Sequence, residues 1–296
     1  MGAPRIAVAV VTMGNRPDEV DALLESVAKQ DVPPERIVVV GNGCPLPDFA
    51  RLSLPGEVTT VELDENLGCP GGRNAALARL REFGDIDVVV DLDDDGLLVD
   101  ADVLRRVRDL YAADERLGIV GFRIADELGE TQQRHVPRIG NSDPLRGGYV
   151  TGFLGGGHAL RMAMLDEVGD WPAEFFFAHE ETDLAWRAVD AGWRILYAPE
   201  LLLRHPKTSP ARHAIYFRVN ARNRVWLARR RLPLALVPVH LGVWVLLTLA
   251  RNRSGAGLRA WAGGFVEGVR ESAGERRPMR WRTVWRLTRL GRPPVI

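Results

Sequence analysis

The sequence predicts an α/β protein in which a mostly parallel sheet is flanked by helices and followed by a helical, basic and apolar C-terminal tail. Short apolar runs typical of buried strands recur at Ile6–Val11, Ile37–Val40 and Val88–Val90. Segments with apolar residues at helical spacing separate these runs, as in Asp18–Gln30. Alternation of this kind is typical of parallel sheets with helices on both faces.

The other elements follow in chain order. They are a strand at Val58–Leu63, a helix at Gly71–Phe83, a helix from His179 that ends at Gly192, and a strand from Trp193 through Tyr197 to His205. Between residues 118 and 199 the pattern changes to short strands and glycine-rich loops. Ligands bind outside the carboxyl ends of parallel strands, so we expect a site beyond the Val88–Val90 strand.

Composition limits the class of protein. The chain has 296 residues, 46% of them hydrophobic, enough for one large domain and an appendage. Residues 1–203 carry 19 Lys and Arg against 36 Asp and Glu, whereas residues 204–296 carry 20 against 3. This asymmetry predicts an acidic domain and a tail that meets an anionic surface. Two cysteines, Cys44 and Cys69, fit a reducing cytoplasm, and Ile6–Val11 is too short for a signal peptide.

A group of four acids follows the Val88–Val90 strand: Asp91, Asp93, Asp94 and Asp95. Carboxylates so close together raise one another's pKa unless a cation neutralises them. Hard oxygen ligands favour Mg²⁺ or Mn²⁺ over Zn²⁺. The alternative is an acidic turn that caps the helix starting near Asp102.

A second acidic group, Glu180, Glu181 and Asp183, opens the helix that ends at Gly192. Acids in a first helical turn also interact favourably with the helix dipole, so a purely structural role is an alternative. Two such groups in one chain favour a catalytic site.

Taken together, these residues resemble glycosyltransferase family 2, nucleotide-sugar-dependent enzymes with a GT-A fold and a Rossmann-like sheet, and especially its bacterial rhamnosyl- and galactofuranosyl-type members. The resemblance covers about residues 5–225. Its motifs are Val10-Val11-Thr12, Asn66-Leu67-Gly68 through Gly71-Gly72-Arg73-Asn74, Asp93-Asp94-Asp95, Gly155–Gly157, Glu180-Glu181 with Asp183, Leu184 and Arg187, then Gly192, Pro199 and His205. The order and spacing of the whole set make the resemblance specific.

The resemblance implies an inverting transfer of a sugar from a UDP- or dTDP-linked donor, with Mn²⁺ or Mg²⁺ bridging the diphosphate. It implies ribose contact by Asp93 or Asp94 and metal contact by Asp95, His205 and Asp93. Glu181 aligns with the general base, which takes the proton of the acceptor hydroxyl. Asp183 competes for that role, and Glu180 is an acceptor-side contact.

Further contacts are expected on the same basis. Donor contacts are expected from Thr12, Asn15, Asn42, Asn66, Gly71 and Arg73, and acceptor contacts from Gly156, Gly157, Trp171 and Arg222. The alternative for Thr12, Asn15 and Asn42 is an ordinary turn, and for the Gly71-Gly72 pair a helix start without a ligand. Many members carry Asp where Gly41 stands, a position that helps to recognise the nucleotide base. The identity of the base is therefore left open.

We expect residues 1–213 to form the catalytic domain. We expect the tail, residues 214–296, to contact a membrane. Leu232–Ala250 is 19 residues without a charge, long enough to span a bilayer. Pro233, Pro238 and the arginines on both flanks favour a helix lying in the interface instead. Trp and Arg at helical spacing in Leu258–Val269 and Arg280–Leu290 favour interfacial helices. A helical cap on the catalytic domain or a partner subunit is the alternative.

These features predict a cell-envelope glycosyltransferase at the cytoplasmic face of the membrane, acting on a glycan or polyprenyl-linked acceptor. Nucleic acid binding is not expected, because the aromatic residues of the tail lie within apolar helical stretches. One alternative is a membrane-associated nucleotide-sugar-binding protein without catalysis. Another is a phosphohydrolase of the haloacid-dehalogenase type, which the segment Val88–Asp100 also resembles. Leu97, however, stands where the Asp-x-Asp-Gly-Thr motif of those enzymes has Thr.

Overall fold

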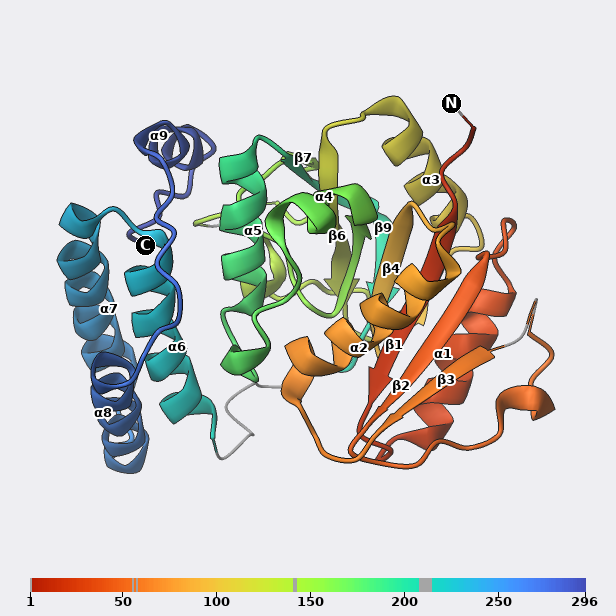
Figure 1. Cartoon of the computed structure of the whole chain (residues 1–296), viewed down its shortest axis with the longest axis horizontal. Helices are drawn as coiled ribbons and strands as arrows, with labels where there is room; N and C mark the ends of the chain where they lie inside the picture. Colours follow the sequence, from red (N-terminus) through yellow and green to blue (C-terminus); the bar gives the residue numbers. More distant parts are fainter. Residues whose placement is uncertain (1, 55, 57, 141–142, 208–214) are drawn as a thin grey trace.

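Among the residues that the structure describes, a nine-stranded sheet forms the centre of the protein, in the order β3-β2-β1-β4-β8-β6-β9-β5 with β7 beside β9 (Figure 1). The structure is a computed structural model that describes all residues except 1, 55, 57, 141–142 and 208–214. The strands are β1 (Ile6–Thr12), β2 (Arg36–Asn42), β3 (Val58–Leu63), β4 (Val88–Asp93), β5 (Leu97–Leu98), β6 (Leu117–Ala125), β7 (Gly148–Tyr149), β8 (Gly157–Arg161) and β9 (Arg194–Arg204).

The predicted α/β class is confirmed, and the sheet is mixed. β3, β2, β1 and β4 are parallel neighbours, as are β6 and β9. β8 runs antiparallel to both β4 and β6. It does so because the chain enters β8 at the carboxyl end of β4, where the Asp93 amide donates to the Gly156 carbonyl at 3.0 Å. The glycine-rich loop before β8 therefore lies over the end of β4.

Helices cover both faces of the sheet. They are α1 (Pro17–Ala28), α2 (Gly68–Phe83), α3 (Val103–Ala113), α4 (Met162–Val168) and α5 (Glu180–Ala191), with 3-10 turns η1 (Phe49–Arg51), η2 (Gln133–His135) and η3 (Ala173–Phe175). Successive β1 residues face opposite cores, as strand geometry requires. Ile6 and Val8 pack in the core with α1 and α3, while Ala7 and Ala9 belong to the core that contains α2 and α5.

Helix α2 begins at Gly68, before the predicted start at Gly71. Gly68 has a φ of 73°, and a Cβ there would lie 2.2 Å from the Phe176 carbonyl oxygen. The Gly71-Gly72 pair, which predicts the start, lies inside the helix. A Cβ on Gly72 would lie 2.5 Å from Val11 Cγ1, so the glycine allows α2 to approach β1 closely.

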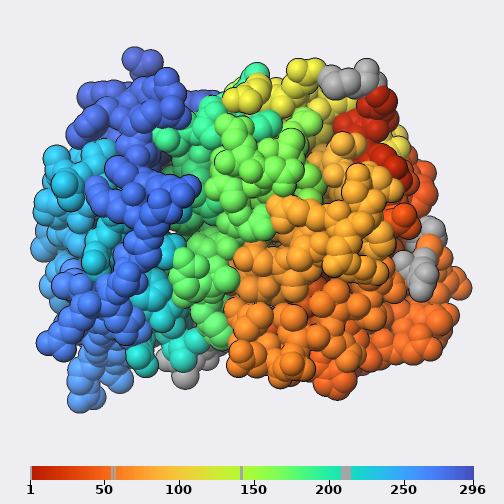
Figure 2. All heavy atoms as spheres, viewed as in Figure 1, coloured from red at the N-terminus to blue at the C-terminus, as the bar shows by residue number. Residues whose placement is uncertain are grey.

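The C-terminal helices form a layer at one end of the molecule, shown in blue in Figure 2. They are α6 (Tyr216–Arg231), the 3-10 turn η5 (Leu234–Leu236), α7 (Val237–Arg251), α8 (Gly255–Arg270) and α9 (Trp281–Arg289). Trp226 and Leu227 of α6 lie in the same core as Ala185 and Ala188 of α5. The tail therefore shares a core with the α/β part. The predicted boundary between residues 213 and 214 lies outside the described residues.

Helix α7 lies on the outside of this layer (Figure 1). Leu234–Arg251 is the described segment long and apolar enough to cross a membrane, and 6% of it is buried. Leu246 and Leu249 are 69% and 58% exposed. An apolar helix thus faces solvent.

Candidate active site

Four segments meet at the carboxyl end of β4. They are the end of β4 itself, the Gly155–Gly157 loop before β8, the first turn of α5 and the end of β9. We call Asp93, Asp94, Asp95 and His205 the Asp–His cluster, and Glu180 with Glu181 the glutamate pair.

The Asp–His cluster has the geometry of a metal site. His205 Nε2 lies 3.0 Å from Asp95 Oδ1 and 3.5 Å from Asp93 Oδ2, and one ligand atom from each residue falls within 4.8 Å of the others. Burial opposes the charge on His205, but hydrogen bonds to Asp93 and Asp95 outweigh it and raise the pKa of His205 to about 10. The structure thus brings together the three predicted metal ligands.

Asp94 faces the loop after β1. Thr12 Oγ1 donates to Asp94 Oδ2 at 2.8 Å. Arg16 Nη1 donates to Asp94 Oδ1 at 3.2 Å and also bonds to Asp95. Thr12 and Asp94 are predicted donor contacts, whereas Arg16 is not predicted from the sequence, because its position after Gly14-Asn15 indicates a turn. The Asn15 side chain is exposed.

Arg73 lies beneath the Asp–His cluster and is 2% exposed. Its Nε donates to Asp91 at 3.0 Å, and its Nη2 donates to the Gly155 carbonyl at 2.8 Å and to Asp93 at 3.4 Å. The guanidinium lies 4.8 Å from the Trp171 ring. Arg73 therefore neutralises the strand-end carboxylates from inside the protein, although its buried Nη1 has no hydrogen-bond partner among the described residues.

The glutamate pair has the opposite electrostatic environment. Burial, followed by the neighbouring Glu181 charge, raises the pKa of Glu180 to about 8, and burial also raises the pKa of Glu181. Glu180 is 3% exposed. A Cβ on Gly155 would lie 2.6 Å from Glu181 Oε1, so glycine at this position leaves room for the carboxylate where it lies. A carboxyl group with a raised pKa is suited to accept a proton near neutral pH.

Asp183 is not part of this arrangement, which corrects the prediction that it competes as the base. It is fully buried, with Arg187 Nε at 2.7 Å and Arg231 Nε at 2.6 Å. Burial opposes its charge, but the two arginines outweigh burial and lower the pKa of Asp183. A carboxylate held by two guanidinium groups is a poor proton acceptor. Its role is to join α5 to α6.

Two predicted donor contacts, the buried Asn42 and the exposed Asn66, form hydrogen bonds that shape the loop before α2. Asn42 Nδ2 donates to Asn66 Oδ1 at 3.1 Å and to the Gly68 carbonyl at 3.0 Å. Asn66 Oδ1 in turn accepts from the Gly68 amide at 2.8 Å. Gly71 packs against Leu67, whose Cβ a Cβ on Gly71 would meet at 2.5 Å. These contacts account for the side chains without a ligand.

The predicted acceptor contacts divide in the same way. Gly156 borders the Asp–His cluster, since a Cβ there would lie 3.4 Å from Asp93 Oδ2. Gly157 is the first residue of β8, where Leu203 approaches it, and Trp171 is 3% exposed beneath Arg73. Arg222 donates to the Phe175 carbonyl at 3.2 Å. The last three support the scaffold, a correction that follows from their burial and partners.

A model of the family described as "Glycosyltransferase like family 2" matches residues 4–225. The chain belongs to glycosyltransferase family 2. It is therefore an enzyme of glycosyl transfer, and the phosphohydrolase alternative is set aside. No curated protein matches the chain.

Solved glycosyltransferases share the fold of this family 2 member. Residues 1–349 of TarS from S. aureus align with a TM-score of 0.60 and 19% identity, over 91% of this chain and 82% of that one. The chain covers 50% of the longer TarS structure. The mannosyltransferase PcManGT from Pyrobaculum calidifontis, in complex with GDP-Man and Mn²⁺, aligns with a TM-score of 0.55 and 18% identity, over 98% and 85%. At these identities the similarity concerns the fold.

Proposed function

We propose that this family 2 glycosyltransferase is an inverting, metal-dependent enzyme that transfers a sugar from a nucleoside diphosphate to a hydroxyl of a glycan or polyprenyl-linked acceptor of the cell envelope. One observation carries the proposal: the Asp–His cluster, where the pKa of Asp93 is lowered to about 2, and a glutamate pair with raised pKa values lie at the two sides of one glycine loop. The first suits a metal and a diphosphate, and the second suits proton transfer.

The Asp–His cluster fits Mn²⁺ or Mg²⁺. Two carboxylates and an imidazole, from Asp93, Asp95 and His205, form a mainly hard donor set. The PcManGT structure holds Mn²⁺, as does a structure of GalNAc-T7 with UDP and GalNAc. When bound, the cation neutralises charge on the departing diphosphate. The unpartnered Nη1 of Arg73 supports a role for this residue beside the same diphosphate.

Glu181 is the proposed base. The acceptor oxygen bonds to the anomeric carbon from the face opposite the diphosphate, the bond from that carbon to the diphosphate oxygen breaks, and the hydroxyl proton moves to the Glu181 carboxylate. A single displacement of this type inverts the anomeric configuration. Glu180 is more deeply buried, and burial together with the Glu181 charge raises the pKa of Glu180 to about 8, so near neutral pH Glu180 holds a proton and Glu181 is left as the acceptor.

Nucleotide binding tests the proposal. Calorimetry with UDP, dTDP and GDP, with and without Mn²⁺, should show metal-dependent binding of one nucleotide to the wild type. Asp95→Asn should lose this metal-dependent binding. Asp87→Asn, at the exposed opposite end of β4, is the matched control and should bind as the wild type does. Absence of binding to all three nucleotides would contradict the proposal.

We also propose that the C-terminal layer rests on the cytoplasmic face of an anionic membrane. The exposed apolar surface of α7, together with Trp281 and Trp285 of α9 at 51% and 62% exposure, supports contact with lipid. The 20 basic residues against 3 acidic ones after residue 203 support a preference for anionic headgroups.

Flotation tests the membrane contact. The wild type should float with phosphatidylcholine vesicles that contain phosphatidylglycerol, and less with phosphatidylcholine alone. Glu in place of both Leu246 and Leu249 should reduce flotation. Leu128→Glu, a change at an 84% exposed leucine of the α/β part, should leave it unchanged. Equal flotation of all three proteins would contradict the proposed surface.

A further inference from the structure

The segment just before the glutamate pair has an unusual backbone. Phe176, Ala178 and His179 have φ values of 62°, 69° and 72°, in the left-handed region that non-glycine residues rarely adopt. Three such residues within four positions persist only where the surroundings hold them. The next residues in the chain are Glu180 and Glu181.

Helix α2 supports this segment from one side. The Phe176 carbonyl accepts a hydrogen bond from the Cys69 amide at 3.0 Å. Gly68 makes that approach possible, because a Cβ at this position would meet the same carbonyl oxygen at 2.2 Å.

Helix α6 supports the segment from the other side through Asn223, which is fully buried. Its Nδ2 lies 2.8 Å from the carbonyl oxygens of Phe175 and Phe177, and 2.9 Å from that of Ala178. One side-chain amide thus faces three carbonyls of the strained segment. The Phe175 carbonyl also accepts from the Phe177 amide at 2.6 Å and from Arg222 at 3.2 Å, so Asn223 adds a buried side-chain donor to a segment outside regular helix and strand.

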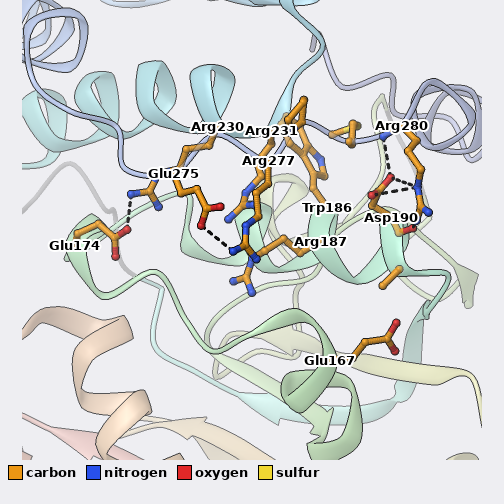
Figure 3. Close-up of a pocket in the computed structure, with 13 residues that line it drawn as sticks. Glu167, Glu174, Trp186, Arg187, Asp190, Arg230, Arg231, Glu275, Arg277 and Arg280 are labelled. Atoms are coloured by element: carbon orange, nitrogen blue, oxygen red, sulfur yellow. Dashed lines mark hydrogen bonds and ion pairs between the residues drawn. The ribbon is translucent and has the colours of Figure 1, made fainter.

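Neighbouring contacts keep α6 in register with α5. Arg231 of α6 bonds to Asp183. Arg230 pairs with Glu174 just ahead of the segment (Figure 3). The segment after α8 adds Arg280, which bonds to Asp190 of α5 (Figure 3). A cavity of about 640 Å³ separates these ion pairs, and the glutamate pair and the Asp–His cluster do not line it. The C-terminal layer therefore holds α5 by these polar contacts as well as by the apolar core that the two share.

We infer that Asn223 is a positioning residue, which fixes the backbone of Phe175–Ala178 so that the glutamate pair points at the Gly155 loop. The inference rests on the proposed function of Glu181. It gives the C-terminal layer a part in the active site that is separate from membrane contact. A residue that merely packed α6 against the domain would affect stability and leave the chemistry of folded molecules unchanged.

Two variants test this role. Asn223→Asp keeps the size of the side chain but turns an oxygen toward three carbonyl oxygens, while Asn223→Ser keeps one O–H donor. The matched control is Gln30→Glu, because Gln30 is 7% exposed and its amide also donates to two backbone carbonyls, of Ser26 and Asp100. Gln30 lies between α1 and the start of β2, at the end of the parallel strands opposite the carboxyl end of β4.

The readouts are Mn²⁺-dependent nucleotide binding, the rate at which nucleoside diphosphate is released from the sugar nucleotide with water as acceptor, and the pH profile of that rate. For folded protein, Asn223→Asp should bind nucleotide as the wild type does but release product about 10²-fold more slowly, because small misplacement of a catalytic group costs that much. Its pH profile should also shift, since the glutamate pair changes its surroundings. Asn223→Ser should be intermediate, and Gln30→Glu should keep the wild-type rate and profile.

The results distinguish a failure of the proposed role of Asn223 from a failure of the proposed glycosyl transfer. A wild-type rate and pH profile in folded Asn223→Ser and Asn223→Asp would overturn the inference alone. If Asn223→Asp does not fold, Asn223→Ser decides the question by the same readouts. A wild type that neither binds nucleotide nor releases it from any sugar conjugate would overturn the proposed function, and the inference with it.

Discussion

Asp93 of the Asp–His cluster and Glu180 of the glutamate pair are acids at the two sides of one glycine loop, yet their surroundings shift their pKa values in opposite directions. Burial opposes ionisation of Asp93, but His205 and Arg73 outweigh it and lower its pKa to about 2. At Glu180, burial and the Glu181 charge act together and raise the pKa to about 8. The number of acids is therefore less informative than the cations that face them.

The largest effect is expected at Asp183, the third acid in the first turn of α5. Asp183→Asn leaves Arg187 and Arg231 buried without their carboxylate, so we expect a loss of about 3–5 kcal/mol in the free energy of unfolding. Urea unfolding measures this loss. Asp170→Asn, which removes the half-exposed partner of Arg81, is the control and should cost less than about 1 kcal/mol. A stable Asp183→Asn that has lost product release would restore Asp183 as a candidate base.

The pH dependence of the free energy of unfolding tests whether the pKa of Glu180 is raised in the folded protein. Because the pKa of Glu180 rises from 4.5 to about 8 on folding, the folded state holds a proton that the unfolded state releases. This contribution to stability is complete below pH 4.5 and is lost as the pH rises toward 8. Stability of Glu180→Gln should therefore fall less than that of the wild type between pH 5 and pH 8 in urea titrations. His205 acts in the same direction in both proteins, so an identical fall would show that Glu180 is ionised throughout.

The smallest effect is expected at Arg16. This side chain supplies a positive charge to Asp94 and Asp95 and is 23% exposed. Removing it in Arg16→Ala should tighten Mn²⁺ binding without nucleotide by about two- to fivefold, in line with the modest energy of partly exposed ion pairs. Arg51→Ala, which removes the partner of Asp21, is the control. Weaker Mn²⁺ binding in Arg16→Ala would mean that Arg16 holds the carboxylates in place instead of competing with the metal.

Local patterns predicted the helices and strands, and they also predicted that a group of acids lies at the end of β4. The valine runs of β2 and β4 are hydrophobic on both faces, and the acids follow the end of β4 directly. His205 lies far along the chain from Asp95, and it was assigned through the family resemblance and not through spacing. The orientation of Arg73 was also beyond prediction, because it depends on Asp91, Gly155 and Trp171 from three different segments.

Asp183 shows why the rest could not be predicted. In sequence it resembles its two acidic neighbours in the same helical turn. What distinguishes it is Arg231, 48 residues away on α6. Asn223 contacts the Phe175–Ala178 segment across a similar separation. Partners that arrive through tertiary packing leave no local pattern, and these partners decide which acids are ionised and which backbone is strained.

The most direct test of the separate roles of the Asp–His cluster and the glutamate pair is to measure nucleotide binding and nucleoside diphosphate release in Glu181→Gln. We predict that this variant binds the nucleotide with Mn²⁺ as tightly as the wild type, while the release of nucleoside diphosphate falls by about 10²–10⁴-fold, the usual contribution of a general base. Asp95→Asn should lose binding and release together. Loss of Mn²⁺-dependent binding in Glu181→Gln, or release at the wild-type rate, would contradict the separation of donor binding from proton transfer.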